Sequence, residues 1–312
     1  MDVILSDRKL DNQMFPQNVE IVLTTYKTLD KYDNNPNVLA IVGSRAMAIK
    51  AEKMNLKGLK LFQLTSAGFD GVPCERYAAR KVKVANAGNV YSIPIAETVI
   101  FGMLSMAKKL HENPNNRHCK IQRNYYTITE LAGKSVLIMG TGSIGTEIAK
   151  RLAGFEMIID GYNRSGTYSP QYRKILNNYD ELMAGIGKYD YFVSTLPDNE
   201  QTKGLLKSEL FSAMKKTAVV INVGRRTVFD EEDFYIALKN GIIGGAVLDM
   251  FEKMPNPIQN KFRRLHNVIV LPGVAAISQE VNERLKQHIT QNLLRIINGS
   301  EVSNVINAVI VS

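Results

Sequence analysis

A glycine-rich turn between a predicted strand and a predicted helix constrains this chain more than any other feature. The apolar run Ser135–Met139 leads into the turn, and a helical pattern follows over residues 146–155. A strand, a G-x-G-x-x-G turn and a helix in that order are typical of a dinucleotide-binding unit. The sequence therefore predicts a pyrophosphate site formed by the six residues of the turn: Gly140, Thr141, Gly142, Ser143, Ile144 and Gly145.

Each glycine of the turn has its own physical reason. Gly140 permits a tight turn, Gly142 lets the backbone approach a pyrophosphate, and Gly145 lets the helix pack closely on the strand. The amides at the helix N-terminus would then face the phosphate charge. A bare glycine turn without a ligand is the alternative, but the flanking strand and helix favour the dinucleotide site.

The composition indicates a globular protein with free thiols. The chain has 312 residues, 45% hydrophobic and 22% charged, which is enough for about two domains. No apolar run reaches the roughly 18 residues of a membrane helix, and the N-terminus lacks the basic and apolar regions of a signal peptide. Cys74 and Cys119 have no metal-binding or redox spacing. We therefore expect a cytoplasmic chain with no membrane partner and no metal.

The net charge of +9 raises the question of nucleic-acid binding. The basic residues are scattered, with short pairs such as Lys108-Lys109 and Arg263-Arg264. No nucleic-acid recognition motif accompanies them. We expect a solvated basic surface that attracts anionic substrates and phosphates, and no nucleic-acid partner.

The order of apolar runs and helical stretches predicts an α/β fold with two domains. Residues 1–92 and 277–312 are expected to form a smaller flavodoxin-like substrate domain, and residues 93–276 a Rossmann cofactor domain inserted in it. The predicted strands of the smaller domain are residues 3–6, 19–23, 38–42, 59–64, 83–84 and, returning from the tail helix 279–297, residues 304–310. Those of the Rossmann domain are residues 135–139, 157–162, 191–194, 219–223, 245–248 and 268–271.

The end of the second Rossmann strand predicts the choice of cofactor. An acidic residue about 20 positions after the turn normally binds the ribose 2′-hydroxyl and selects NAD. Here that position is Asn163, followed by Arg164 and Ser165. A guanidinium and a hydroxyl would instead bind a 2′-phosphate through charge-assisted hydrogen bonds. We expect these three residues to bind the cofactor and to prefer NADP over NAD; an ordinary surface turn is the alternative. Asp160 is expected to lie away from the ribose edge.

Five further motifs, in the right order, resemble the D-2-hydroxyacid dehydrogenase family. They are residues 131–134, 196–206, 221–225, 245–252 and 267–272. The resemblance covers nearly the whole chain, and the family contains glyoxylate/hydroxypyruvate reductases and phosphoglycerate dehydrogenases. By this resemblance the cofactor site also includes Leu196, Pro197, Thr202, Val223, Gly224 and Asp249.

The resemblance implies hydride transfer between a nicotinamide cofactor and a small 2-keto or D-2-hydroxy acid. Arg225 would be the catalytic cation that grips the substrate carboxylate and polarises its carbonyl. The loop containing Ala67 and Gly68 would bind the same carboxylate through backbone amides, with Phe69 packed beneath it. Arg226 is either a second substrate contact or a surface charge. A homodimer formed through the cofactor domains is implied by the resemblance alone.

The sequence departs from the family pattern at the acid–base pair. Met254 stands where the family has glutamate, and Gly273 stands where it has the catalytic histidine. None of the four histidines is an obvious substitute. Tyr91 is a candidate proton donor because a phenol can donate a proton and a nearby arginine would lower its pKa; packing between the domains is the alternative role.

Two functions therefore remain open. The first is an NAD(P)-dependent oxidoreductase of the 2-hydroxyacid dehydrogenase type. The second is a catalytically impaired NADP-binding homologue with a regulatory or binding role, which the replacements at Met254 and Gly273 would favour.

Overall fold

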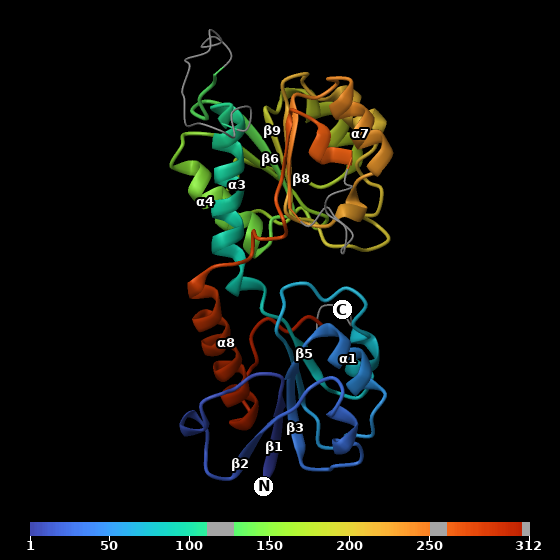
Figure 1. Cartoon of the computed structure of the whole chain (residues 1–312), viewed down its shortest axis with the longest axis vertical. Helices are drawn as coiled ribbons and strands as arrows, with labels where there is room; N and C mark the ends of the chain where they lie inside the picture. Colours follow the sequence, from blue (N-terminus) through green and yellow to red (C-terminus); the bar gives the residue numbers. More distant parts are fainter. Residues whose placement is uncertain (111–127, 250–260, 308–312) are drawn as a thin grey trace. The chain divides into compact units, whose positions relative to one another are not determined.

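The computed structural model describes residues 1–110, 128–249 and 261–307. The chain divides into two compact units, Met1–Tyr91 with Ser278–Ser312, and Ser92–Ile277. It therefore passes between the units twice, and each unit has its own parallel sheet (Figure 1).

The first unit has a five-stranded sheet of parallel strands in the order β2-β1-β3-β4-β5. This is the flavodoxin-like order. Leu5 and Ile4 are adjacent in β1 and belong to the separate cores on the two faces of the sheet, because successive strand side chains point to opposite faces. The elements are β1 (Asp2–Ser6), β2 (Val19–Leu23), β3 (Val38–Gly43), β4 (Leu61–Leu64), β5 (Lys83–Ala85), α1 (Arg45–Glu52), α2 (Cys74–Ala79) and α8 (Gln279–Ile297).

Different helices cover the two faces of this sheet. Residues of α1 and α2, including Met47 and Tyr77, pack with Phe62 in one core. Residues of α8, including Leu285 and Leu293, pack in the other core with Ala40. The apolar spacing of α8 follows the helical period, and its bounds agree with those predicted from the sequence. Its N-terminus is capped by the Ser278 side chain, which accepts a hydrogen bond from the Val281 amide.

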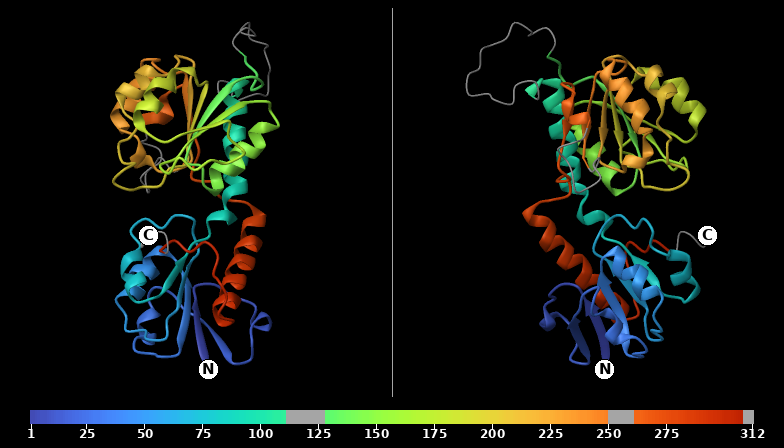
Figure 2. Two further views of the ribbon diagram at one scale, coloured as in Figure 1. Left: turned by 180° about the vertical axis from the view of Figure 1, so that it is seen from behind. Right: turned by 45° about the vertical axis from the view of Figure 1, so that its right-hand side comes forward.

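The second unit has a seven-stranded parallel sheet in the order β12-β11-β10-β9-β6-β7-β8. The chain order reverses between β6 and β9, as in a Rossmann sheet, where ligands bind beyond the carboxyl ends of the strands. Its elements, seen from two sides in Figure 2, are β6 (Ser135–Met139), β7 (Ile158–Tyr162), β8 (Lys174–Leu176), β9 (Tyr191–Ser194), β10 (Val219–Asn222), β11 (Gly245–Leu248), β12 (Val268–Val270), α3 (Ser92–Ala107), α4 (Ser143–Ala153), α5 (Tyr179–Gly185), α6 (Ser208–Ala213) and α7 (Glu231–Lys239).

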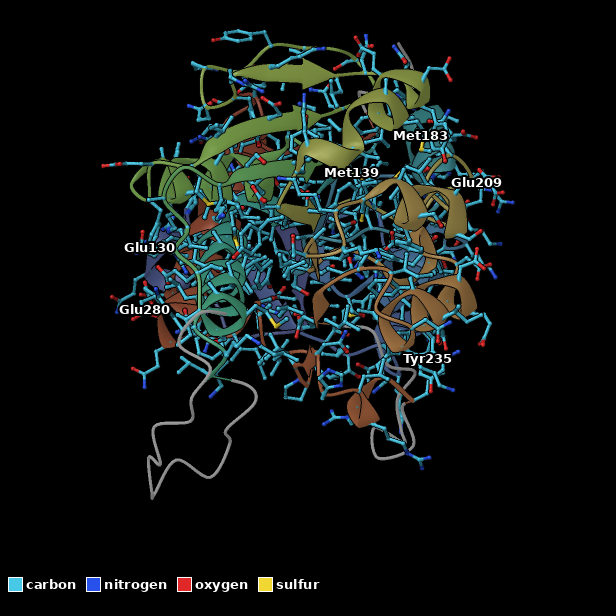
Figure 3. The ribbon with its side chains drawn as sticks, turned by 90° about the horizontal axis from the view of Figure 1, so that it is seen from above. Glu130, Met139, Met183, Glu209, Tyr235 and Glu280 are labelled. Carbon is cyan, nitrogen blue, oxygen red and sulfur yellow. The ribbon has the colours of Figure 1, made fainter. Side chains whose placement is uncertain are left out.

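The core of the second unit lies on both faces of its sheet. Met139, the last residue of β6, is fully buried and lies in the interior in Figure 3, whereas Glu209 and Tyr235 lie at the rim. On the other face, α3 approaches the sheet so closely that a Cβ on Gly102 would lie 2.8 Å from Val247.

Short 3-10 helices in the two units are Asn12–Met14, Leu29–Tyr32, Gly88–Val90, Ile186–Lys188, Arg226–Val228 and Lys261–Arg264.

Two sequence expectations need correction. The strand β8 was not predicted, because it has only three residues at the sheet edge. The predicted strand 304–310 does not form over its described residues, where Val305 makes an isolated bridge to Ala85. Asn304 has a φ of 56°, and Asn307 contacts the β5 region with its side chain, through Val84 N and Val82 O. The segment returns to the first unit as expected, but side-chain hydrogen bonds replace part of the strand ladder.

Candidate active site

The glycine turn after β6 is held by Thr195, the residue after β9. Thr195 Oγ1 donates to the carbonyl oxygens of Met139 and Gly140, each at 3.0 Å. Gly140 has a φ of 95°, a conformation that L side chains rarely adopt. A Cβ at Gly140 would also lie 2.4 Å from Thr195 Oγ1. The turn therefore requires glycine at this position for both backbone and packing reasons.

The other two glycines of the turn differ in their surroundings. A Cβ on Gly145 would lie 2.0 Å from the Gly140 carbonyl oxygen, whereas a Cβ on Gly142 would meet no atom within 4 Å. Gly142 is the N-cap of α4, where no side chain caps the first-turn amides. Open space beside uncapped helix amides suits an anionic group. This arrangement fits the pyrophosphate of a dinucleotide, beside Thr141, Ser143 and Ile144.

The turn after β7 is tied to the glycine turn through Asn163. Its Nδ2 donates to Thr141 Oγ1 at 2.7 Å and to the Thr167 carbonyl at 3.1 Å, while its Oδ1 accepts from Ser165 Oγ at 3.2 Å. Asn163 therefore shapes the turn. Arg164 is exposed, and its Nη1 donates to Gln201 Oε1 at 2.8 Å.

Asp160 lies in β7 but forms part of the core, as the sequence predicted when it excluded this residue from the ribose edge. Its carboxylate is fully buried and accepts two hydrogen bonds from Arg173, at 2.8 and 3.0 Å, and one from Tyr189 at 2.8 Å. Burial raises the pKa of Asp160, but the bonds from Arg173 and Tyr189 outweigh it and leave that pKa below its usual value. The carboxylate is therefore ionised and structural.

The loop after β9 is organised by two of its own side chains. Thr202 Oγ1 donates to the Pro197 carbonyl at 2.6 Å, and Asn199 Oδ1 accepts from the amides of Gln201 and Thr202, each at 3.0 Å. Leu196 is buried. Thr202 thus shapes the loop, and Gln201 is a residue that the sequence analysis missed, because its partner Arg164 is 37 positions away in sequence.

Arg225 follows the carboxyl end of β10 and is partly exposed. The backbone before it is tightly held: Gly224 N donates to Asn222 Oδ1 at 3.1 Å, and a Cβ on Gly224 would lie 2.7 Å from the Leu196 carbonyl oxygen. Val223 and Gly224 are buried. The next residue, Arg226, pairs with Glu231 at 2.5 Å, which favours the surface-charge role over substrate contact.

Asp249 and Gly273 meet beyond β11 and β12. Asp249 is 3% exposed, and its carboxylate accepts from the amides of Val274 and Ala275 at 3.0 and 3.4 Å. Burial raises the pKa of Asp249, against the opposing effect of these amides. Gly273 has a φ of 73°, so a histidine there would be strained. Met254, the other position where the sequence predicts a departure from the family pattern, lies outside the described residues.

The first unit holds the other predicted substrate residues. Tyr91 donates its hydroxyl proton to the Thr65 carbonyl at 2.5 Å. Burial raises the pKa of Tyr91. The lowering expected from a nearby arginine comes from Arg8, but it does not outweigh the effect of burial. Ala67 and Gly68 are partly exposed, as their predicted contact with a substrate requires. Phe69 is 36% exposed, so its predicted packing beneath the loop would cover only part of the ring.

Asn86 positions the loop of Ala67 and was not anticipated from the sequence. Its Nδ2 donates to the Ala67 carbonyl at 2.7 Å, its Oδ1 accepts from Gly88 N at 3.2 Å, and its amide donates to the Asn304 carbonyl at 3.0 Å. His288 of α8 hydrogen-bonds the Asn86 carbonyl at 3.0 Å, and burial lowers the pKa of that imidazole. His288 is thus a packing residue of this network.

Comparison with known proteins identifies the family. The family described as "D-isomer specific 2-hydroxyacid dehydrogenase, NAD binding domain" matches residues 100–275, more than half of the chain. The chain belongs to this family. The predictions of family, of a Rossmann-containing α/β fold and of an NAD(P) cofactor are confirmed.

Curated relatives of the chain are named as dehydrogenases or reductases. The chain is 29% identical to a D-3-phosphoglycerate dehydrogenase of Archaeoglobus fulgidus over 276 residues, which are 87% of this chain and 52% of that protein. It is also 29% identical to a glyoxylate reductase of Thermofilum pendens, over 83% of this chain and 78% of that protein. The chain thus spans about half the length of the first relative.

Solved structures agree with the fold. A D-isomer specific 2-hydroxyacid dehydrogenase family protein of Aeromonas salmonicida is 26% identical, with a TM-score of 0.79 and 98% of each chain covered. An NADPH-dependent glyoxylate/hydroxypyruvate reductase of Sinorhizobium meliloti, solved with NADP and sulfate, has a TM-score of 0.78 at 23% identity, over 99% of each chain. Both likenesses show the fold that the sequence predicted. Within the described ranges, no helix is long and apolar enough to cross a membrane.

Proposed function

We propose that this chain transfers a hydride between NADP(H) and a small 2-keto or D-2-hydroxy acid. The observation that carries the proposal is the pairing of an open glycine turn after β6 with an exposed arginine after β7. Gly142 leaves space beside the uncapped amides of α4, and Arg164 is exposed at the end of the neighbouring strand. The nicotinamide supplies the hydride when bound; the chain supplies positioning, charge and a proton.

The preference for NADP over NAD rests on the charge at the turn after β7. Among the residues described, no carboxylate pairs with Arg164, and Asp160 is occupied by Arg173 and Tyr189. A 2′-phosphate would therefore meet a guanidinium and the Ser165 hydroxyl without competition from an acid. NADPH is expected to bind at least about tenfold more tightly than NADH, a difference near 1.4 kcal/mol.

The substrate proposal rests on two carboxylate-binding elements. Arg225 carries the charge that would hold the carboxylate and polarise the carbonyl, and the loop containing Ala67 and Gly68 would add backbone amides. The names of the relatives suggest glyoxylate and hydroxypyruvate as first substrates to try. Asp249 is proposed to lie near the carboxamide of the cofactor, with Leu196, Pro197, Thr202, Val223 and Gly224 beside its other parts.

The proton for the product alkoxide needs a separate source, because glycine occupies position 273. Tyr91 is the proposed donor. Its raised pKa keeps the phenol protonated at neutral pH, but its hydroxyl must turn away from the Thr65 carbonyl to act. A phenol of high pKa is a weak general acid, so turnover is expected to be slow.

The test is NADPH oxidation followed by absorbance with glyoxylate, hydroxypyruvate, pyruvate and bulkier 2-keto acids. Arg225→Ala should abolish keto-acid binding and leave NADPH affinity nearly unchanged. Arg226→Ala is the matched control, since it removes the same group from the next residue, which pairs with Glu231. Keto-acid binding that survives in the Arg225 variant would place the anchor elsewhere. Absence of turnover with every acid of the panel would contradict the proposed activity.

We also propose a cytoplasmic homodimer formed through the cofactor-binding units. Phe101 on α3 is 57% exposed and Ile158 at the start of β7 is 40% exposed, which supplies apolar surface on that unit. Light scattering coupled to size-exclusion chromatography tests the assembly; a monomer at micromolar concentration would exclude it.

A further inference from the structure

We propose that Gln201 is a positioning residue for NADP(H) selectivity. Its neutral amide oxygen orients the Arg164 guanidinium at the 2′-phosphate position without cancelling the positive charge. The inference rests on the NADP preference proposed above and adds a second determinant to it, on a different loop.

The contact joins loops on both sides of the glycine turn. Arg164 follows β7 and Gln201 follows β9, and these strands flank β6 in the sheet. The hydrogen bond from Arg164 Nη1 to Gln201 Oε1, at 2.8 Å, therefore passes across the edge of the sheet where the turn after β6 lies. Since ligands of such sheets bind beyond the carboxyl ends of the strands, the contact lies on the ligand-binding edge.

Other contacts hold the backbone of both loops, so the contact with Gln201 orients the Arg164 side chain. Asn199 Oδ1 accepts from the Gln201 amide at 3.0 Å, which fixes the backbone of Gln201. Asn163 ties the base of the Arg164 turn to Thr141 at 2.7 Å. Long arginine side chains have many rotamers, and one hydrogen bond to a fixed acceptor reduces the ordering required on binding.

The chemical type of the acceptor distinguishes this arginine from others in the same unit. Arg173 pairs with Asp160, Arg226 with Glu231, and Arg151 with Glu147. In those pairs a carboxylate compensates the charge, whereas Arg164 is held by an amide. A guanidinium oriented by a neutral acceptor keeps its charge for a phosphate, and a carboxylate in place of the amide would both compete for the arginine and repel the phosphate.

The experiment measures dissociation constants for NADPH and NADH by calorimetry in the full chain. Gln201→Glu keeps the side-chain shape and adds one negative charge; we expect NADPH to bind about tenfold more weakly and NADH to change less than twofold. Gln201→Ala removes the acceptor and should weaken NADPH about threefold. In an Arg164→Ala background the loss caused by Gln201→Glu should become smaller, because the competition for the arginine has gone.

Asn240→Asp is the matched charge control. Asn240 ends α7 and precedes β11, so it lies at the edge where the strands begin, away from the ligand-binding edge. It should leave both constants unchanged. Thermal unfolding of each variant checks folding.

Three results would overturn the inference. Equal weakening of NADPH and NADH by Gln201→Glu would show that the contact only stabilises the loop. A preference for NADPH that survives Gln201→Glu unchanged would overturn the inference while leaving the proposed cofactor preference in place. Equal affinities of the unmodified chain for the two cofactors would instead refute that preference, and the inference with it.

Discussion

The second and third glycines of the turn, Gly142 and Gly145, should separate cofactor binding from folding when each is changed to alanine. Gly142 has φ −72° and ψ −162°, which alanine also adopts, and its Cβ would meet no atom within 4 Å. Gly142→Ala should therefore leave stability unchanged or raise it by up to about 1 kcal/mol. The added methyl group would occupy the space where a pyrophosphate approaches the backbone, so NADPH should bind at least about tenfold more weakly.

Gly145→Ala should affect folding directly. Its Cβ would lie 2.0 Å from the Gly140 carbonyl oxygen, a backbone atom that moves only if α4 shifts away from β6. Overpacking of this kind costs about 1–3 kcal/mol. In a unit of about 150–250 residues each kcal/mol lowers Tm by about 2–4 °C, so we expect a decrease of about 2–12 °C.

The assay combines calorimetric NADPH titration with thermal unfolding of both variants. Gly154→Ala is the control, because this glycine ends the same helix and its Cβ would make an ordinary 3.4 Å contact with the Arg151 carbonyl. NADPH affinity should not change, and Tm should stay the same or rise slightly. Wild-type NADPH affinity in Gly142→Ala would refute the pyrophosphate assignment. A wild-type Tm for Gly145→Ala would refute the packing argument.

Three other predictions follow from the same structure. Asp160→Asn should lower the free energy of unfolding by about 1–3 kcal/mol at pH 7, and this loss should be smaller in acid. The pKa of this carboxylate is lowered on folding, so its contribution to stability is present above the unfolded pKa near 4 and disappears as the pH falls through the folded pKa. Denaturant unfolding at pH 7 and pH 3 measures the loss, and equal losses would contradict the ion-pair role. Tyr91→Phe should lower kcat by about 10² with NADPH affinity unchanged, whereas an unchanged kcat would assign protonation to water. Gly273→His with Met254→Glu should raise kcat and introduce a titration near pH 6–7, at a cost in Tm because φ at position 273 is 73°; a pH-independent rate would show that the new imidazole does not reach the substrate.

Local patterns were sufficient for most of the fold. Strand, turn and helix around Gly140–Gly145 could be predicted because the glycine spacing and the flanking apolar periodicity are both short-range signals. The bounds of α8 followed from its long amphipathic pattern. The edge strand β8 was not predicted, because three residues are too few to show an alternating apolar pattern. The predicted strand after Ser303 was wrong, because the side chain of Asn307 forms the hydrogen bonds to backbone groups of the β5 region.

The sequence by itself determined the fold class, the family resemblance and the residue types at the cofactor turn, since these depend on neighbours in the chain. Only the tertiary structure decided what those residues contact. It assigned Asp160 to a buried ion pair, turned Asn163 inward to hold Thr141, and brought Gln201 to Arg164. It also gave Gly273 a left-handed backbone. Such contacts join positions far apart in the chain, and the pairing of parallel strands, which no local pattern specifies, brings them together.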